Sequence, residues 1–225
     1  MSKKIKKEKR IQTIGEEVAN SVSHGLMTVF GIVGLIMMLI KSTDEFQVAS
    51  AIIFGISMII LYLSSTMYHA LSFTGAKSVF KRFDHIGIYM LIGGTFAPIF
   101  LLLPAFRVPI FGMEGWITLG LLLCILQWVL IITGMVFKSI WVYKFQTMHI
   151  VIFLLLGWSG LYFMIDLYKY SPSTMWLILL GGLSYSIGVI FYKQSDKLYF
   201  HFIWHLFVGL GTILQFMAIY IYLII

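Results

Sequence analysis

The sequence predicts an all-α protein, a bundle of seven transmembrane helices, from three observations. Of the 225 residues, 60% are hydrophobic and only 11% are charged, whereas a soluble domain carries roughly 25% charged residues. The apolar segments are apolar on every side rather than alternating, which favours helices over the strands of a membrane barrel. Seven such segments are present, each about as long as a bilayer core of roughly 30 Å requires.

The predicted spans follow one another with short loops between them. They cover about residues 24–40, 48–70, 85–104, 115–137, 146–165, 174–192 and 201–223. Pro98 and Pro104 fall late in the third span, where proline predicts a kink or an end, and Pro172 fits the loop before the sixth. We therefore expect one transmembrane domain, residues 24–225, preceded by a cytoplasmic segment, residues 1–23.

The segment before the first span is basic and then amphipathic. Ile11, Ile14, Val18 and Val22 recur at spacings of three and four, so they share one face of a helix. Because basic and acidic residues lie off this face, we expect a short interfacial helix on the inner leaflet. Polar residues continue to His24 without a convincing cleavage site, which predicts a retained span rather than a signal peptide.

The basic residues predict the orientation. If the N-terminus is cytoplasmic, 13 of the 16 Lys and Arg residues lie on the cytoplasmic side, and only Lys41, Arg107 and Lys169 lie outside. This is a strong positive-inside signal, which places the C-terminal Ile225 outside. The net charge of +7 then reflects inner loops that face anionic lipid. Membrane lipids are the expected partners, and nucleic acid is not.

The histidines all fall at the predicted cytoplasmic ends of spans, and Asp84 falls at the same level. Ionisable groups at membrane depth are costly and usually functional. Cys124 is the one cysteine, so a Cys-based metal site is excluded. The six histidines are His24, His69, His85, His149, His201 and His205.

One histidine pair has the spacing of metal ligands. His201 and His205 are four positions apart, which puts both imidazoles on one helix face, where a zinc ion can take two ligands. The alternative is a pair of interfacial histidines bonded to headgroups and loop carbonyls. His69 at the same level, with Ser65 one turn deeper and Asp84 just beyond the next loop, favours the metal site.

Four motifs follow one another through nearly the whole chain. They are Glu17-Val-Ala-Asn20-Ser-Val-Ser-His24, Ser65-Thr-Met-Tyr-His69, Phe83-Asp84-His85-Ile-Gly87 with Gly93-Gly94-Thr95-Phe96-Ala-Pro98, and His201-Phe-Ile-Trp-His205. In this order they resemble the motifs of the progestin and adipoQ receptor family, in particular its bacterial hemolysin III branch, which predicts a multi-pass protein of the bacterial cell membrane.

The resemblance implies one zinc ion near the cytoplasmic side, bound by His69, His201 and His205. It implies that Asp84 lies close through a water, with Ser65 able to hydrogen-bond that water or a substrate. The roles of Glu17, Asn20 and His24 stay open between support of the ligands and a structural clasp, and we favour a clasp that joins the interfacial helix to the bundle.

Three histidine ligands leave a fourth position open, which is typical of catalytic zinc. With Asp84 as the proton acceptor, this predicts a hydrolase acting on an amide or ester of a membrane lipid, a function inferred by analogy. One alternative is a non-catalytic, zinc-stabilised sensor or regulator of membrane lipid homeostasis. A pore-forming haemolysin ranks last, because the ionisable groups cluster at one side rather than through the membrane.

Overall fold

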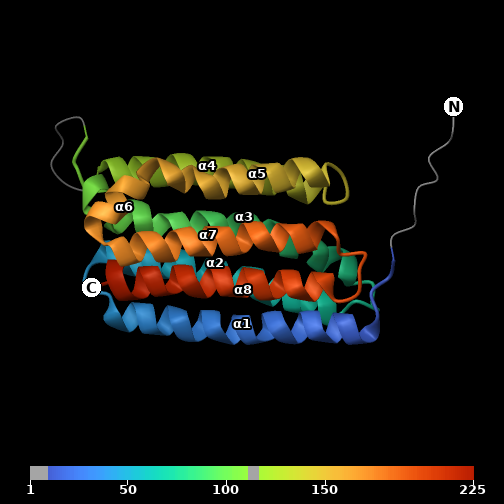
Figure 1. The fold of residues 1–225 in the computed structure, drawn as a ribbon. Coiled ribbons are helices and arrows are strands. Elements are labelled where there is room, and N and C mark those ends of the chain that lie inside the picture. Colours follow the sequence, from blue (N-terminus) through green and yellow to red (C-terminus); the bar gives the residue numbers. More distant parts are fainter. Residues whose placement is uncertain (1–9, 111–116) are drawn as a thin grey trace, which may run out of the picture.

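The computed structural model describes residues 10–110 and 117–225, and these residues form a helical bundle. Seven of the described helices are long and apolar enough to cross a membrane, which confirms the predicted fold class. Figure 1 shows them packed side by side, with the start of α1 and the C-terminus at opposite ends of the bundle.

The helices follow the predicted spans with shifts of a few residues at their ends. The start of the predicted fourth span, 115–116, lies outside the described residues. The elements are α1 (Ile14–Lys41), α2 (Glu45–Ala70), α3 (Lys77–Leu102), the 3-10 turn η1 (Pro104–Phe106), α4 (Leu119–Ile140), α5 (Gln146–Trp158), the 3-10 turn η2 (Ser159–Phe163), α6 (Met164–Tyr170), α7 (Pro172–Lys193), α8 (Phe200–Ala218) and the π-helical turn η3 (Ile219–Leu223).

The expected interfacial helix is not a separate element, which corrects the prediction for residues 11–22. Helix α1 begins at Ile14, after a capping box between Thr13 and Glu16, and continues unbroken to Lys41. The reason is the polar face of α1, because Glu17 and the polar residues that share its face of the helix are buried against the bundle. This face has to pack upright against its neighbours, so the segment cannot lie flat on a leaflet. Residues 1–9 lie outside the described part.

Helix α3 is the central helix of the bundle. In its most apolar window 78% of the residues are buried, against 28% in α1 and 22% in α4. It contains Pro98 and still continues to Leu102, while Pro104 follows the end of the helix. A Cβ atom on Gly87 would lie only 2.8 Å from the Cα atom of Leu61, so glycine permits a close approach of α3 to α2.

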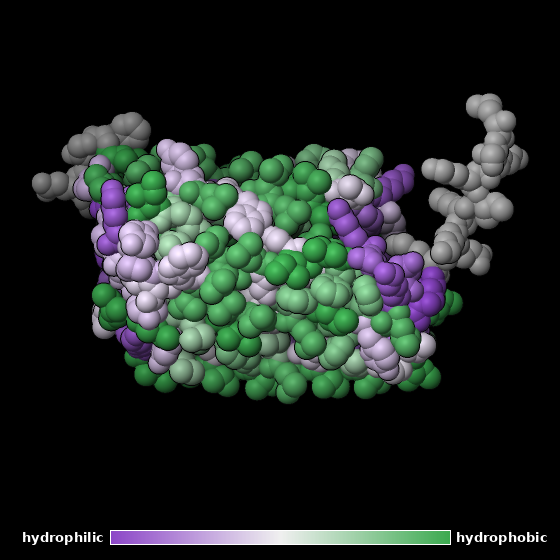
Figure 2. All heavy atoms as spheres, in the orientation of Figure 1, coloured by the Kyte–Doolittle hydropathy of each residue, from purple (hydrophilic) through white to green (hydrophobic). Residues whose placement is uncertain are grey.

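The side of the bundle is apolar, and the polar groups lie toward its two ends, as Figure 2 shows for one face. Large apolar side chains are exposed along the helices, for example Val29, Ile36 and Leu130. Without water at the sides, each helix satisfies its own backbone groups. This is the surface of a protein whose sides face lipid.

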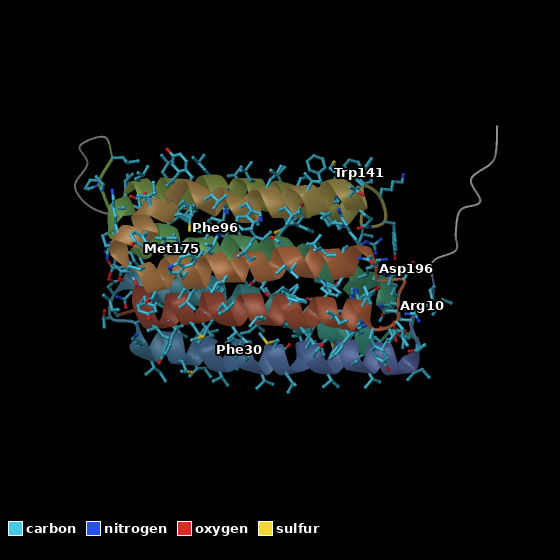
Figure 3. All side chains as sticks on the ribbon, viewed as in Figure 1. Arg10, Phe30, Phe96, Trp141, Met175 and Asp196 are labelled. Atoms are coloured by element: carbon cyan, nitrogen blue, oxygen red, sulfur yellow. The ribbon has the colours of Figure 1, made fainter. Side chains whose placement is uncertain are left out.

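We call the end at which α1 begins the N-terminal end of the bundle. The turns of residues 71–76, 141–145 and 194–199 connect helices at this end. Figure 3 labels Arg10, Trp141 and Asp196 there, with Arg10 beside Asp196. Arg10 Nε donates a hydrogen bond of 3.0 Å to the Asp196 carbonyl, so the segment before α1 is tied to the α7–α8 turn.

Candidate metal centre

Three histidines from α2 and α8 meet at the N-terminal end of the bundle. One ring nitrogen from each of His69, His201 and His205 lies within 4.8 Å of the other two. The ring of His69 is centred 5.1 Å from that of His201 and 5.0 Å from that of His205. His69 and His205 are buried, and His201 is partly buried. Since imidazole nitrogen suits several divalent metals, this group could hold a metal ion.

The hydrogen bond of His69 determines which of its nitrogens is free. Its Nδ1 lies 2.6 Å from Glu17 Oε2, and a carboxylate oxygen accepts, so Nδ1–H is the donor. This leaves the lone pair on Nε2, which is buried and has no hydrogen-bond partner among the described residues. A metal would fit this orphaned nitrogen, and the Glu17–His69 pair is the usual outer support of a metal-bound imidazole.

His205 is held in the same way by the backbone of α1. Its Nδ1 lies 3.2 Å from the carbonyl oxygen of Asn20 and 3.3 Å from Ser23 Oγ. Because a carbonyl only accepts, Nδ1–H donates and the Nε2 lone pair is left for a ligand bond. The Asn20 side chain also approaches His69 Nδ1, at 3.4 Å. Helix α1 therefore orients two of the three histidines.

His24 packs directly on this group. Its ring stacks on that of His205 with a centroid separation of 3.6 Å and an interplanar angle of 5°, and it meets Tyr62 edge-on at 4.9 Å. Both His24 nitrogens are buried without a partner in the described part of the chain. Glu17, Asn20 and His24, for which two roles stayed open, thus contact the ligand candidates themselves.

The turn that precedes helix α8 is held in place by residues at the start of α1. Tyr199 has a left-handed backbone, with φ of 58°, and its N–H donates to Glu16 Oε1 at 2.9 Å. Glu16 also pairs with Arg10, and its hydrogen bond raises the pKa of the Arg10 guanidinium. These contacts set the position of His201 in the first turn of α8.

Asp84 and Ser65 lie near the three histidines in different settings. The Asp84 carboxylate interacts electrostatically with His69 and His24 and lies 3.4 Å from His85 Nδ1. It is not among the atoms that converge within 4.8 Å. Ser65, one turn before His69 on α2, is fully buried, and its Oγ has no partner among the described residues. Ser65 Oγ is therefore available to a molecule placed beside the histidines, while the Asp84 carboxylate also pairs with His85.

The two remaining histidines belong to a second polar group, on the side of α3 that faces α4 and α5. His149 Nδ1 lies 2.9 Å from the Tyr89 hydroxyl, and His85 Nδ1–H donates to the Lys81 carbonyl at 2.8 Å. Lys138 joins them and is only 1% exposed. On the sequence alone, Lys138 is only one of the basic residues assigned to the inner loops. Its place inside the apolar pattern of α4, before the turn, is the signal that could have identified it.

An apolar cavity adjoins both groups. It lies among α3, α4, α5, α7 and α8, and the space there that protein atoms leave unfilled is about 1030 Å³ when the open solvent at its mouth is included. Its lining includes Tyr192, whose ring is 6.1 Å from that of His201, while the three converging histidines do not line it. Tyr192 therefore stands between the cavity and the candidate metal ligands.

Comparison with known proteins shows which family the chain resembles. The family model described as "Haemolysin-III related" matches residues 12–216. The chain is 36% identical over 214 residues to "Hemolysin-3 homolog" of Bacillus subtilis (strain 168), covering 93% of this chain and 95% of that protein. It is 32% identical over 218 residues to "Hemolysin-3" of Bacillus cereus, covering 95% and 94%.

A more distant relative is the human "Monocyte to macrophage differentiation factor", 26% identical over 217 residues and covering 94% of this chain and 86% of that protein. The matched region contains all seven spans almost completely, together with the three converging histidines. The chain is a multi-pass membrane protein, and it belongs to the Haemolysin-III related family.

Proposed function

We propose that this protein is a zinc-dependent hydrolase that cleaves the amide or ester bond of a membrane lipid at the cytoplasmic face. One observation carries the proposal. In both His69 and His205, Nδ1–H is committed to an acceptor on α1, so that Nε2 is left as a free lone pair. The third donor, His201, lies within reach of both. Three neutral imidazoles in such a cluster match the donor set of catalytic zinc.

The residues around the histidines supply the remaining groups for hydrolysis. His69, His201 and His205 would hold the ion, and zinc bound in this way would polarise a carbonyl and lower the pKa of a water to about 7. The Asp84 carboxylate takes the proton of the water that attacks the carbonyl carbon, and returns it to the leaving nitrogen or oxygen as that bond breaks. The buried hydroxyl of Ser65 donates a hydrogen bond to the water or to the substrate.

The surroundings favour a lipid as the substrate. The sides of the bundle face acyl chains, and the lining of the apolar cavity includes Tyr192, whose ring is 6.1 Å from that of His201. A hydrocarbon chain in that cavity places its amide or ester group near the end of the bundle, at headgroup depth. The orientation with this end in the cytoplasm follows from the basic residues.

A zinc-stabilised sensor of membrane lipid is the second candidate. It is favoured by the origin of the contacts, because the ligand candidates come from α2 and α8, and two of them, His69 and His205, are held by α1. A metal ion at this place would join three helices and stabilise the bundle without any turnover.

The decisive experiment measures metal content and turnover together on purified protein. We expect about one zinc per chain, and release of fatty acid from an acyl amide or ester lipid that stops on chelation and returns with zinc. Asp84→Asn should retain the zinc and lose about 100-fold or more in rate, as expected for a general base. Asp166→Asn, at the opposite end of the bundle, is the matched control and should keep both.

Other results separate the alternatives. Full zinc occupancy without turnover of any amide or ester lipid would contradict the hydrolase and favour the sensor. Ion flux through vesicles that contain the purified protein would instead support a pore. Absence of zinc from wild-type protein, with normal folding after chelation, would remove the basis of the first two candidates.

A further inference from the structure

We propose that Lys138 and His149 form a second binding site, for the oxyanion headgroup of a single-chain amphiphile whose hydrocarbon chain lies in the apolar cavity. Nothing in this inference requires the metal centre, and it goes beyond the proposed hydrolysis. It rests on the burial of a lysine at the wall of the cavity, on an unsatisfied histidine nitrogen beside the same space, and on the apolar lining of the rest.

Lys138 is the first part of the argument. It lies in the last turn of α4, is 1% exposed and lines the cavity. Its described hydrogen bond goes to a neutral group, since Nζ donates to Gln146 Oε1 at 3.0 Å. An ammonium has three N–H donors. A buried cation is costly unless it is paired and hydrogen-bonded, so an anionic acceptor from the cavity would complete its environment.

The neighbouring charges do not provide that acceptor. Lys81 repels Lys138 and Asp84 attracts it, and both act through electrostatic interaction. Asp84 also interacts with His85 and with the histidines on the other side of α3. Gln146 is occupied as well, because its Nε2 donates to the Val142 carbonyl. The donors of Lys138 that remain are thus available to a ligand.

His149 provides a second donor at the same wall. It is 1% exposed and lines the cavity. Its Nδ1 lies 2.9 Å from the Tyr89 hydroxyl, and Nε2 has no partner among the described residues. When the phenol O–H donates to Nδ1, the ring proton resides on Nε2. That N–H and the Lys138 ammonium can then donate to one carboxylate or phosphate group.

The rest of the cavity has the character of a chain-binding channel. Its wall is formed mainly by apolar side chains, among them Ile88, Leu91, Phe153 and Val189. Trp158 lines it further along α5, about 13 Å beyond His149 at the usual helical rise. A charged group at one end and an apolar channel beyond it fit an amphiphile better than a neutral lipid or a free anion.

The test uses the cavity's own tryptophans in purified, metal-depleted protein. Bromoundecanoate carries a quenching bromine at its chain end, and bromoundecanol is its neutral counterpart. We expect the acid to quench with an apparent affinity about 10-fold or more above that of the alcohol, as expected for hydrogen bonds to charged groups. Trp158→Phe should remove much of the quenching, which locates the chain end. Equal affinity of acid and alcohol in the wild-type protein would overturn the proposal.

Three variants and a competition complete the design. Lys138→Met should abolish the preference for the acid, Lys138→Arg should keep it, and Lys144→Met, on the exposed turn, should leave it unchanged. An unchanged preference in folded Lys138→Met would refute the site. Dodecyl phosphate should displace the bromo acid, while inorganic phosphate at the same concentration should not. Equal displacement by both would show a free-anion site and overturn the amphiphile. Because the metal is absent throughout, failure here leaves the proposed hydrolysis untouched.

Discussion

Glu17 Oε2 lies 2.6 Å from Nδ1 of His69, although the two residues are 52 positions apart on different helices. The other Glu17 oxygen accepts a 3.0 Å bond from Lys77 Nζ, at the start of α3. One buried carboxylate thus connects α1 with the end of α2 and the start of α3. Helix α1 therefore helps to position a ligand of the candidate metal centre.

Glu17→Gln should weaken zinc binding about 10- to 100-fold, the usual effect of removing the outer partner of a metal-bound histidine. An amide can still accept a hydrogen bond from His69, but it raises the basicity of the imidazole less than a carboxylate does. Competitive zinc titration of purified protein measures the change. Glu45→Gln, an exposed acid at the opposite end of the bundle, is the control. Equal affinity in Glu17→Gln and wild type would show that this contact supports the fold only.

The part of the site that the sequence predicted is the part that depends on depth along the helices. Positive-inside counting and span lengths put His69, His201 and His205 at one level, and the structure brings them together. Spacing within one helix also identified the His201 and His205 face. Both inferences use the position of a residue along its own helix, which the sequence contains directly.

What the sequence left undetermined depends on the lateral order of the helices. The stack of His24 on His205 and the cavity beside Tyr192 require knowing which helix lies next to which. The burial of Lys138 requires the same knowledge, because a lysine in a last helical turn is usually solvated. The continuous α1 was missed because the apolar face of residues 11–22 was assigned to the inner leaflet as that of a separate interfacial helix.

His205→Ala should abolish zinc binding and remove the stabilisation that zinc provides. A ligand that binds only the folded state at 100 times its Kd stabilises it by about 2.7 kcal/mol. The midpoint temperature of thermal unfolding should therefore rise with added zinc in the wild type and stay constant in His205→Ala. His149→Ala, a buried histidine outside the cluster, should respond to zinc as wild type does. A zinc-dependent shift that survives in His205→Ala would place the metal elsewhere.

Gly87→Ala should destabilise the protein by about 1–3 kcal/mol, the usual cost of overpacking. The new Cβ would lie 2.8 Å from the Cα atom of Leu61, and a backbone atom cannot move aside as a flexible side chain can. Separation of α3 from α2 should also move Asp84 away from His69. We therefore expect lower turnover with zinc still bound, measured by thermal unfolding and by lipid hydrolysis.

Gly157→Ala is the matched control for that substitution. Nothing lies within 4 Å of a Cβ atom at this helical position, so alanine should stabilise α5 by about 0.5–1 kcal/mol through its helix propensity. Destabilisation of both variants to the same extent would mean that close packing of α2 on α3 is not the cause.

Glu16→Ala should loosen the α7–α8 turn and expose it to protease. The buried Glu16 carboxylate accepts hydrogen bonds from Thr13 N–H at 2.8 Å and Tyr199 N–H at 2.9 Å. Removing it leaves these donors without their partner, at a cost of about 1–3 kcal/mol each where water cannot replace it. Limited trypsin digestion should then cut faster after Lys197, which is exposed in this turn. Glu45→Ala should be cut at the wild-type rate.

Because Tyr199 directly precedes the first turn of α8, Glu16→Ala should also weaken zinc binding through His201. Rapid cleavage with unchanged zinc affinity would show instead that the turn and the candidate metal centre are independent of each other.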